Sequence, residues 1–148
     1  MREPRAQAKE QSRPKLSPED YAAIIERGDA QKLVAHAEAI GKYLAQVKLP
    51  SSQIRGIFGT VRRIEMNWEE GMPQEKRLWA QRELLLLKPK LAYQAARQRK
   101  QSGGPGMELL KDVLSDAIER VGKDRERFQH FVDFFEAILA YHRAYGGD

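Results

Sequence analysis

The side chains in this sequence that could do chemistry are basic, and they gather in residues 84–100, a stretch that begins with four consecutive leucines. The stretch contains no acidic residue, and its basic residues are Lys88, Lys90, Arg97, Arg99 and Lys100. Ammonium and guanidinium groups bind phosphate oxygens through charge, and guanidinium groups add a forked pair of N–H donors. The stretch therefore suits a polyanion, although a solvated helix surface would have a similar composition.

A helix would set these groups side by side. Residues three, four and seven positions apart share a helix face, so we expect Lys90, Gln94 and Arg97 on one side. Pro89 predicts a kink or a restart of the helix near Lys88. Tyr93 could stack on a nucleic-acid base, but we expect it in the core, since aromatic residues in apolar-rich helices usually pack there.

The net charge of the 148-residue chain, +5, is unevenly distributed. Residues 48–100 contain twelve basic and five acidic residues, a net of +7, whereas residues 17–47 and 101–148 have nets of −2 and −3. Residues 1–16 have a net of +3 and few apolar side chains, so we expect a mobile basic tail there. A basic block between acidic segments is typical of a phosphate-binding surface.

Residues suited to catalysis are sparse. The chain has no cysteine, which excludes thiolate zinc sites and cysteine nucleophiles. Glu126, His130 and Asp133 could share a helix face and bind a metal, but an exposed polar face explains them better. The glycines at 103–104 follow no predicted strand, so they indicate a linker rather than a phosphate-binding loop. We expect no enzymatic activity, no metal and no cofactor.

Apolar residues recur at helical spacing, and no stretch shows the sustained alternation of apolar and polar residues that is typical of a strand. The sequence therefore predicts an all-α fold. We expect one domain, residues 17–147, in which a short N-terminal helix precedes a compact bundle of about five main helices. Ser17, Asp29 and Asp124 are expected N-caps of the first, second and last helices, and Ser51 or Ser52 of the third, which would end near Glu70. The fourth helix begins near Pro73 and leads into the basic stretch. A mobile connection over residues 102–106 then precedes a helix over residues 107–121.

Three helix faces carry further expectations. The fourth helix should point four apolar side chains inward, namely Leu78, Trp79, Leu85 and Leu86. Gly56 and Gly59 in the third helix favour close packing of another helix over approach of a ligand backbone. The apolar face of the last helix, over residues 128–141, is wider than one core contact needs. That helix is either central or partly at an interface, and our hypothesis is the interface.

No apolar run approaches the roughly 18 residues that span a bilayer, and the N-terminus lacks the apolar core of a signal peptide. We therefore expect a soluble cytoplasmic protein with no membrane contact.

Three segments in series resemble a known family. They are residues 51–58 with 61–64, residues 87–97, and residues 131–138 with Tyr141 and the glycines at 146–147. In this order and spacing they are similar to the small subunit of the type III-A CRISPR effector, the Csm complex. The resemblance covers about residues 17–147.

The resemblance implies a helical subunit without nuclease activity, several copies of which stack along the ribonucleoprotein filament. The implied partners are crRNA, target RNA and other Csm subunits, with self-association in the filament and a possible homodimer of the isolated chain. The family's RNA-contacting positions map to Arg55, Arg62, Arg63, Lys88, Lys90 and Arg97. Charge alone adds Lys48, Arg99 and Lys100.

Three alternatives stay open. A pure protein scaffold would touch RNA only incidentally. A helical DNA-binding regulator would need a short-turn helix pair, which the sequence does not indicate. A metal-dependent nuclease would need carboxylates near the basic block, yet there are none between Arg97 and Gly106.

Overall fold

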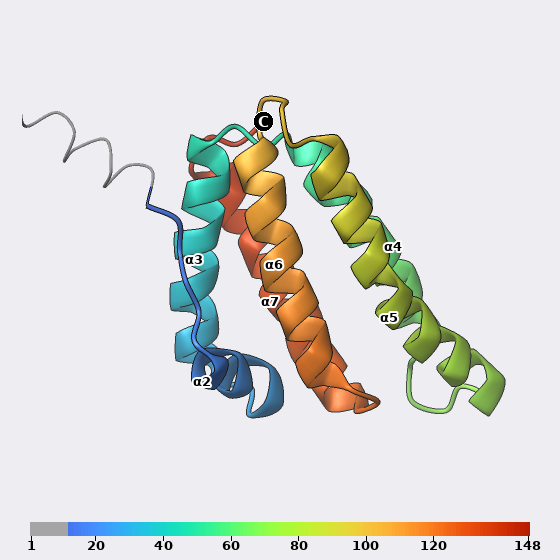
Figure 1. Cartoon of the computed structure of the whole chain (residues 1–148). Coiled ribbons are helices and arrows are strands. Elements are labelled where there is room, and N and C mark those ends of the chain that lie inside the picture. The colour runs from blue at the N-terminus through green and yellow to red at the C-terminus, as the bar shows by residue number, and fades with distance from the viewer. Residues whose placement is uncertain (1–11) are drawn as a thin grey trace, which may run out of the picture.

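The computed structural model describes residues 12–148, which contain helices and turns and no strand, as the all-α prediction requires. After a short α2 (Pro18–Tyr21) and a π-helical turn η1 (Ala22–Glu26) come five longer helices (Figure 1). These are α3 (Ala30–Gln46), α4 (Ser51–Met66), α5 (Gln74–Arg97), α6 (Gly104–Val121) and α7 (Arg125–Ala144). None of the helices in the described range has both the length and the hydropathy to cross a membrane.

Helix α2, the first helix, begins after the predicted N-cap, Ser17. Ser17 Oγ accepts a hydrogen bond from the backbone N–H of Asp20, whose carboxylate accepts one from the Ser17 N–H in return. The proline that follows the cap occupies the first helical position. Residues 1–11 of the expected tail lie outside the described residues. Of the remainder, Arg13 pairs with Asp112 on α6 at 2.6 Å, and Leu16 packs against the core.

Helix α7 is the central element of the bundle. It packs against α3, α4, α6 and η1, and its large apolar side chains, Phe128, Phe131, Val132, Phe134, Phe135 and Ile138, are fully buried. Aromatic contacts tie it to α4 and to the turn after α4. The Phe58 and Phe135 ring centroids lie 5.2 Å apart, and those of Trp68 and Phe128 lie 4.8 Å apart. The interface hypothesis for these phenylalanines is therefore wrong, because they are buried within one chain.

Close approach of α3 to α7 depends on Gly41. A Cβ at this position would lie 2.6 Å from Tyr141 Cβ and 2.8 Å from the His142 backbone nitrogen. Beside it, His142 is fully buried, and its Nε2 lies 2.7 Å from the Leu49 carbonyl oxygen. Residues far apart in sequence thus fix the C-terminal end of α7 to α3 and the loop after it.

Helices α4 and α5 form a hairpin beside α6 and α7 (Figure 1). Helix α4 is flanked by Pro50 without a side-chain cap, so the serine cap predicted there is wrong, and the helix ends at Met66. Helix α5 runs unbroken through Pro89, without the restart considered for it.

The outward and inward faces of α5 differ from the prediction. Its buried side chains are Ala80, Leu84, Leu87, Leu91 and Ala95, at helical spacing. Leu78, Trp79, Leu85 and Leu86 are exposed, so their inward placement was wrong. A helix turns by about 100° per residue. Each of the four exposed residues lies one or two positions from a buried one, either Ala80, Leu84 or Leu87, and therefore points away from the core. We call these four residues the outer face of α5.

The glycine-rich segment before α6 is not a loop throughout. Helix α6 already begins at Gly104, after Gly103 at φ +86. A Cβ on Gly106 would lie 3.0 Å from both Leu49 Cβ and Val47 Cγ2, so this glycine permits α6 to pack on the α3–α4 loop. The predicted connection over residues 102–106 was thus wrong for its second half.

Candidate nucleic-acid interface

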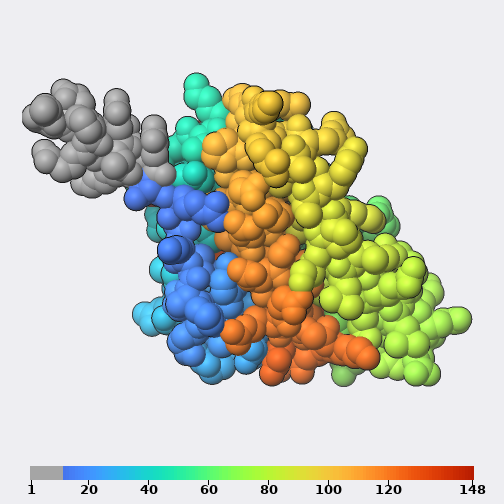
Figure 2. Space-filling model, in the orientation of Figure 1, coloured from blue at the N-terminus to red at the C-terminus, as the bar shows by residue number. Residues whose placement is uncertain are grey.

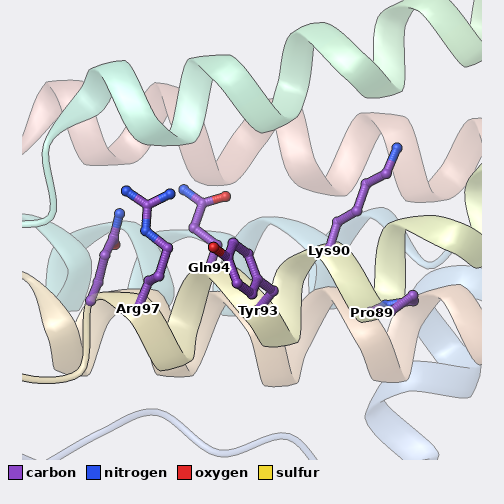
Figure 3. A pocket seen from close by; sticks show the side chains of 6 residues that line it. Pro89, Lys90, Tyr93, Gln94 and Arg97 are labelled. Atoms are coloured by element: carbon purple, nitrogen blue, oxygen red, sulfur yellow. The ribbon is translucent and has the colours of Figure 1, made fainter.

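One flank of α5 forms a basic hollow that is open to solvent. Lys90, Gln94 and Arg97 project from α5 toward α4, as their spacing predicts (Figure 3). The remaining lining residues are Pro89, Tyr93 and Gln98. The buried leucines of α5 hold the opposite side of the helix in the core, so the hollow lies on a fixed element. We call this surface the α5 hollow.

Tyr93 lines the hollow and is not in the core. Its exposed fraction is 66%, and the core expectation for it was wrong. The core positions of this part of α5 are Leu91 and Ala95, and Tyr93 points away from that side because it lies two residues from each. The Arg97 guanidinium carbon lies 5.9 Å from the centroid of the Tyr93 ring, in a cation–π contact. The base-stacking alternative stays open.

Two of the basic residues implied by the family resemblance are paired within the chain. Lys88 forms an ion pair with Glu119 of α6, on the flank of α5 away from the hollow. Arg62 Nη1 lies 3.0 Å from Glu65 Oε1, and its guanidinium lies over the Phe58 ring. In contrast, no carboxylate of residues 12–148 lies within ion-pair distance of Lys90 or Arg97. Lys90 and Arg97 therefore present uncompensated charge.

Helix α4 adds an exposed basic surface with two open glycines. Arg55, Arg62 and Arg63 are all exposed. Nothing lies within 4 Å of a Cβ built on Gly56 or Gly59, so the expected packing of a helix there is wrong. The other explanation, approach of a ligand backbone to the exposed helix backbone, stays a prediction.

Lys48, Arg99 and Lys100 lie at one end of the bundle. Lys48 is in the loop after α3, with a left-handed φ of +65°, and the other two follow the last residue of α5. The two loops are neighbours, because a Cβ on Gly103 would lie 3.0 Å from the Lys48 carbonyl oxygen. All three side chains are exposed. They extend the basic surface beyond the end of α5.

Carboxylates with a lowered pKa lie on other elements. A hydrogen bond from Arg120 lowers the pKa of Glu26 on η1. Burial raises the pKa of Asp112 on α6, but hydrogen bonds from Lys111 and Arg13 outweigh it and lower the pKa overall. Glu26 and Asp112 therefore stay ionised near neutral pH, and each is paired with cations that do not line the α5 hollow.

The possible metal ligands of α7 are used differently. His130 Nδ1 lies 2.8 Å from the Ile25 carbonyl oxygen, a contact that joins α7 to η1. Within residues 12–148, no three His, Asp or Glu side chains are grouped so that they could hold a metal ion.

The fold and the site together define an all-helical protein with a basic hollow on the exposed flank of one core-packed helix. The comparison with known families identifies the family to which the chain belongs. The family model Csm2 Type III-A matches residues 27–148, and the chain belongs to this family. It is a small subunit of the type III-A CRISPR effector, the Csm complex. Comparisons with curated proteins and with solved structures find no match.

Proposed function

We propose that this subunit binds the backbone of crRNA or target RNA through the α5 hollow and the adjoining face of α4, without catalysing a reaction. The observation that supports this most strongly is the uncompensated charge of Lys90 and Arg97 on a helix fixed in the core. Backbone phosphates need only charge and donors, since base pairing between guide and target supplies the sequence specificity. Lys88 contributes less, because Glu119 already pairs with it.

The experiment is an RNA-binding titration over a range of salt concentrations. In the test variant, Lys90→Gln and Arg97→Gln are combined. In the matched control, Lys42→Gln and Arg143→Gln remove two exposed charges from α3 and α7. Each lost phosphate contact lowers the slope of log K against log salt by about 0.7–0.9. We expect weaker binding and a slope shallower by about 1.4–1.8 in the test variant only.

Three results would contradict the proposed RNA contact. Equal effects of the test and control variants would mean that only net charge matters. Absence of RNA binding by the wild-type chain, alone and in the assembled complex, would leave a pure protein scaffold. A clear preference for duplex DNA over RNA would instead favour the regulator alternative.

We also propose that copies of this chain stack head to tail along the filament, with the outer face of α5 at the contact. Leu78, Trp79, Leu85 and Leu86 expose 36–54% of their area, although apolar side chains on a stable monomer are usually scattered singly. The residues of α2 and of α5 lie at opposite sides of the bundle (Figures 1 and 2). The basic block contains α5 and the acidic segment 17–47 contains α2 and α3, so charge complementarity supports a second copy as the occupant.

A further inference from the structure

We propose that Tyr93 is a stacking platform for one unpaired base of the RNA bound at the α5 hollow. This inference rests on the proposed RNA contact and adds a recognition mode to it. Bare phosphate binding would need only the cations. An aromatic ring in their midst adds a surface on which every base can stack. The ligand class is therefore a single-stranded nucleotide, since paired bases within an RNA helix already stack on their neighbours.

The exposure of the ring is the first observation. Tyr93 exposes 66% of its area, the largest value among the exposed large apolar and aromatic side chains of the described residues. It is also set among cations, because Lys90 and Arg97 line the same hollow (Figure 3). No carboxylate belongs to this lining. An exposed ring surrounded by basic groups favours an aromatic, anionic ligand over an aliphatic protein surface.

The support of the ring is the second observation. The Arg97 guanidinium carbon lies 5.9 Å from the ring centroid, so the cation restrains the ring and remains exposed to a phosphate. Pro89, one turn earlier, fixes the backbone dihedral on that side of the hollow. A base stacked on the ring would meet a platform that is already oriented.

The spacing of the polar groups is the third observation. Lys90 and Arg97 are two helical turns apart, roughly 10 Å along the axis, with Tyr93 between them. Phosphates on either side of a stacked nucleotide could therefore each meet one cation. The amide of Gln94 projects into the same hollow (Figure 3), where it offers donors and an acceptor to the edge of a base. The α5 hollow thus has separate groups for phosphate, base face and base edge.

The test uses the full chain and an RNA oligonucleotide that contains 2-aminopurine, whose fluorescence falls when the base stacks. Three single variants are compared: Tyr93→Phe keeps the ring, Tyr93→Leu removes it, and Trp79→Leu removes another exposed ring from the same helix. We expect Tyr93→Leu to weaken single-strand binding by about 5- to 150-fold, the range for one stacked base. It should also abolish the fluorescence change and leave the salt slope unaltered. Tyr93→Phe and Trp79→Leu should resemble the wild type.

Several outcomes would overturn the stacking role. Wild-type affinity of Tyr93→Leu would remove Tyr93 from the RNA site while the phosphate contacts stand. A shallower salt slope in Tyr93→Leu would mean that the ring only positions Arg97. An equal loss on fully paired RNA would exclude an unpaired base. If the wild-type chain binds no RNA, the proposed function itself fails, which is a different result from the other three.

Discussion

Asp20 stabilises the N-terminal turn of α2 through its charge. Its Oδ2 accepts a hydrogen bond from the Ser17 backbone N–H at 2.9 Å, and its Oδ1 lies 3.0 Å from Lys32 Nζ. The bond from Ser17, and then that from Lys32, hold the pKa of Asp20 well below its usual range. The folded state therefore favours the ionised carboxylate, which gives this residue a pH-dependent contribution to stability.

Asp20→Asn should lower the free energy of unfolding by about 1 kcal/mol at pH 7, because the neutral amide loses the ion pair with Lys32 and accepts the Ser17 N–H more weakly. A carboxyl whose pKa is depressed by folding contributes fully above its unfolded pKa of about 3.9 and loses the contribution as pH falls through the lower, folded value. The difference between wild type and variant should therefore shrink below about pH 4. Urea unfolding across pH measures it, with the exposed Glu19→Gln as control. A difference independent of pH would contradict the assigned role.

At the scale of elements, Gly41 on α3 permits a close helix contact whereas Gly56 on α4 faces open space, and replacing each with alanine distinguishes the two roles. Gly41→Ala should destabilise the chain by about 1–3 kcal/mol, because the new Cβ would meet Tyr141 and the α7 backbone at under 3 Å. Gly56→Ala should stabilise it by up to about 1 kcal/mol, since its Cβ would meet nothing and alanine favours a helix. Chemical denaturation of both variants measures the contrast. Equal effects would mean that α3 and α7 do not approach closely at Gly41.

Most helix positions and three of the N-caps could be predicted from local chemistry, but the cap of α4 and the faces of α5 could not. Ser17, Asp29 and Asp124 cap their helices as expected, because a cap depends on neighbouring residues only. In α5, leucines at 84–87 and apolar residues at 78, 79 and 93 surround the helix. Periodicity therefore does not select a buried side, and tertiary packing decides it.

The candidate site was also predictable only in part, because some of its features depend on local helical spacing and others on tertiary packing. Helical spacing alone placed Lys90, Gln94 and Arg97 together. It could not show that Lys88 pairs with Glu119, thirty-one residues away on α6. Nor could it show that Tyr93 is exposed, because that depends on which face of α5 meets the core. Contacts between elements distant in sequence set both properties.

At the scale of the whole molecule, the outer face of α5 should matter for assembly and not for folding. Leu78→Gln combined with Leu85→Gln should leave the free energy of unfolding of the isolated chain within about 0.5 kcal/mol of the wild type, because both side chains are about half exposed. In the reconstituted effector complex, the same variant should reduce the number of copies incorporated, since an apolar contact between copies would become polar. Native mass spectrometry counts the copies.

The control for this prediction replaces exposed apolar residues elsewhere on the bundle. Val34→Gln on α3 lies near the acidic side that a second copy would present, so it should also reduce incorporation, whereas Met66→Gln at the end of α4 should not. Normal copy numbers for the Leu78 and Leu85 variant would remove the outer face of α5 from the assembly contact. Loss with that variant but not with Val34→Gln would mean that α5 meets a different subunit. Leu78, Leu85 and Val34 lie outside the α5 hollow and α4, so the RNA affinity of their isolated variants should stay unchanged, which separates assembly from RNA binding.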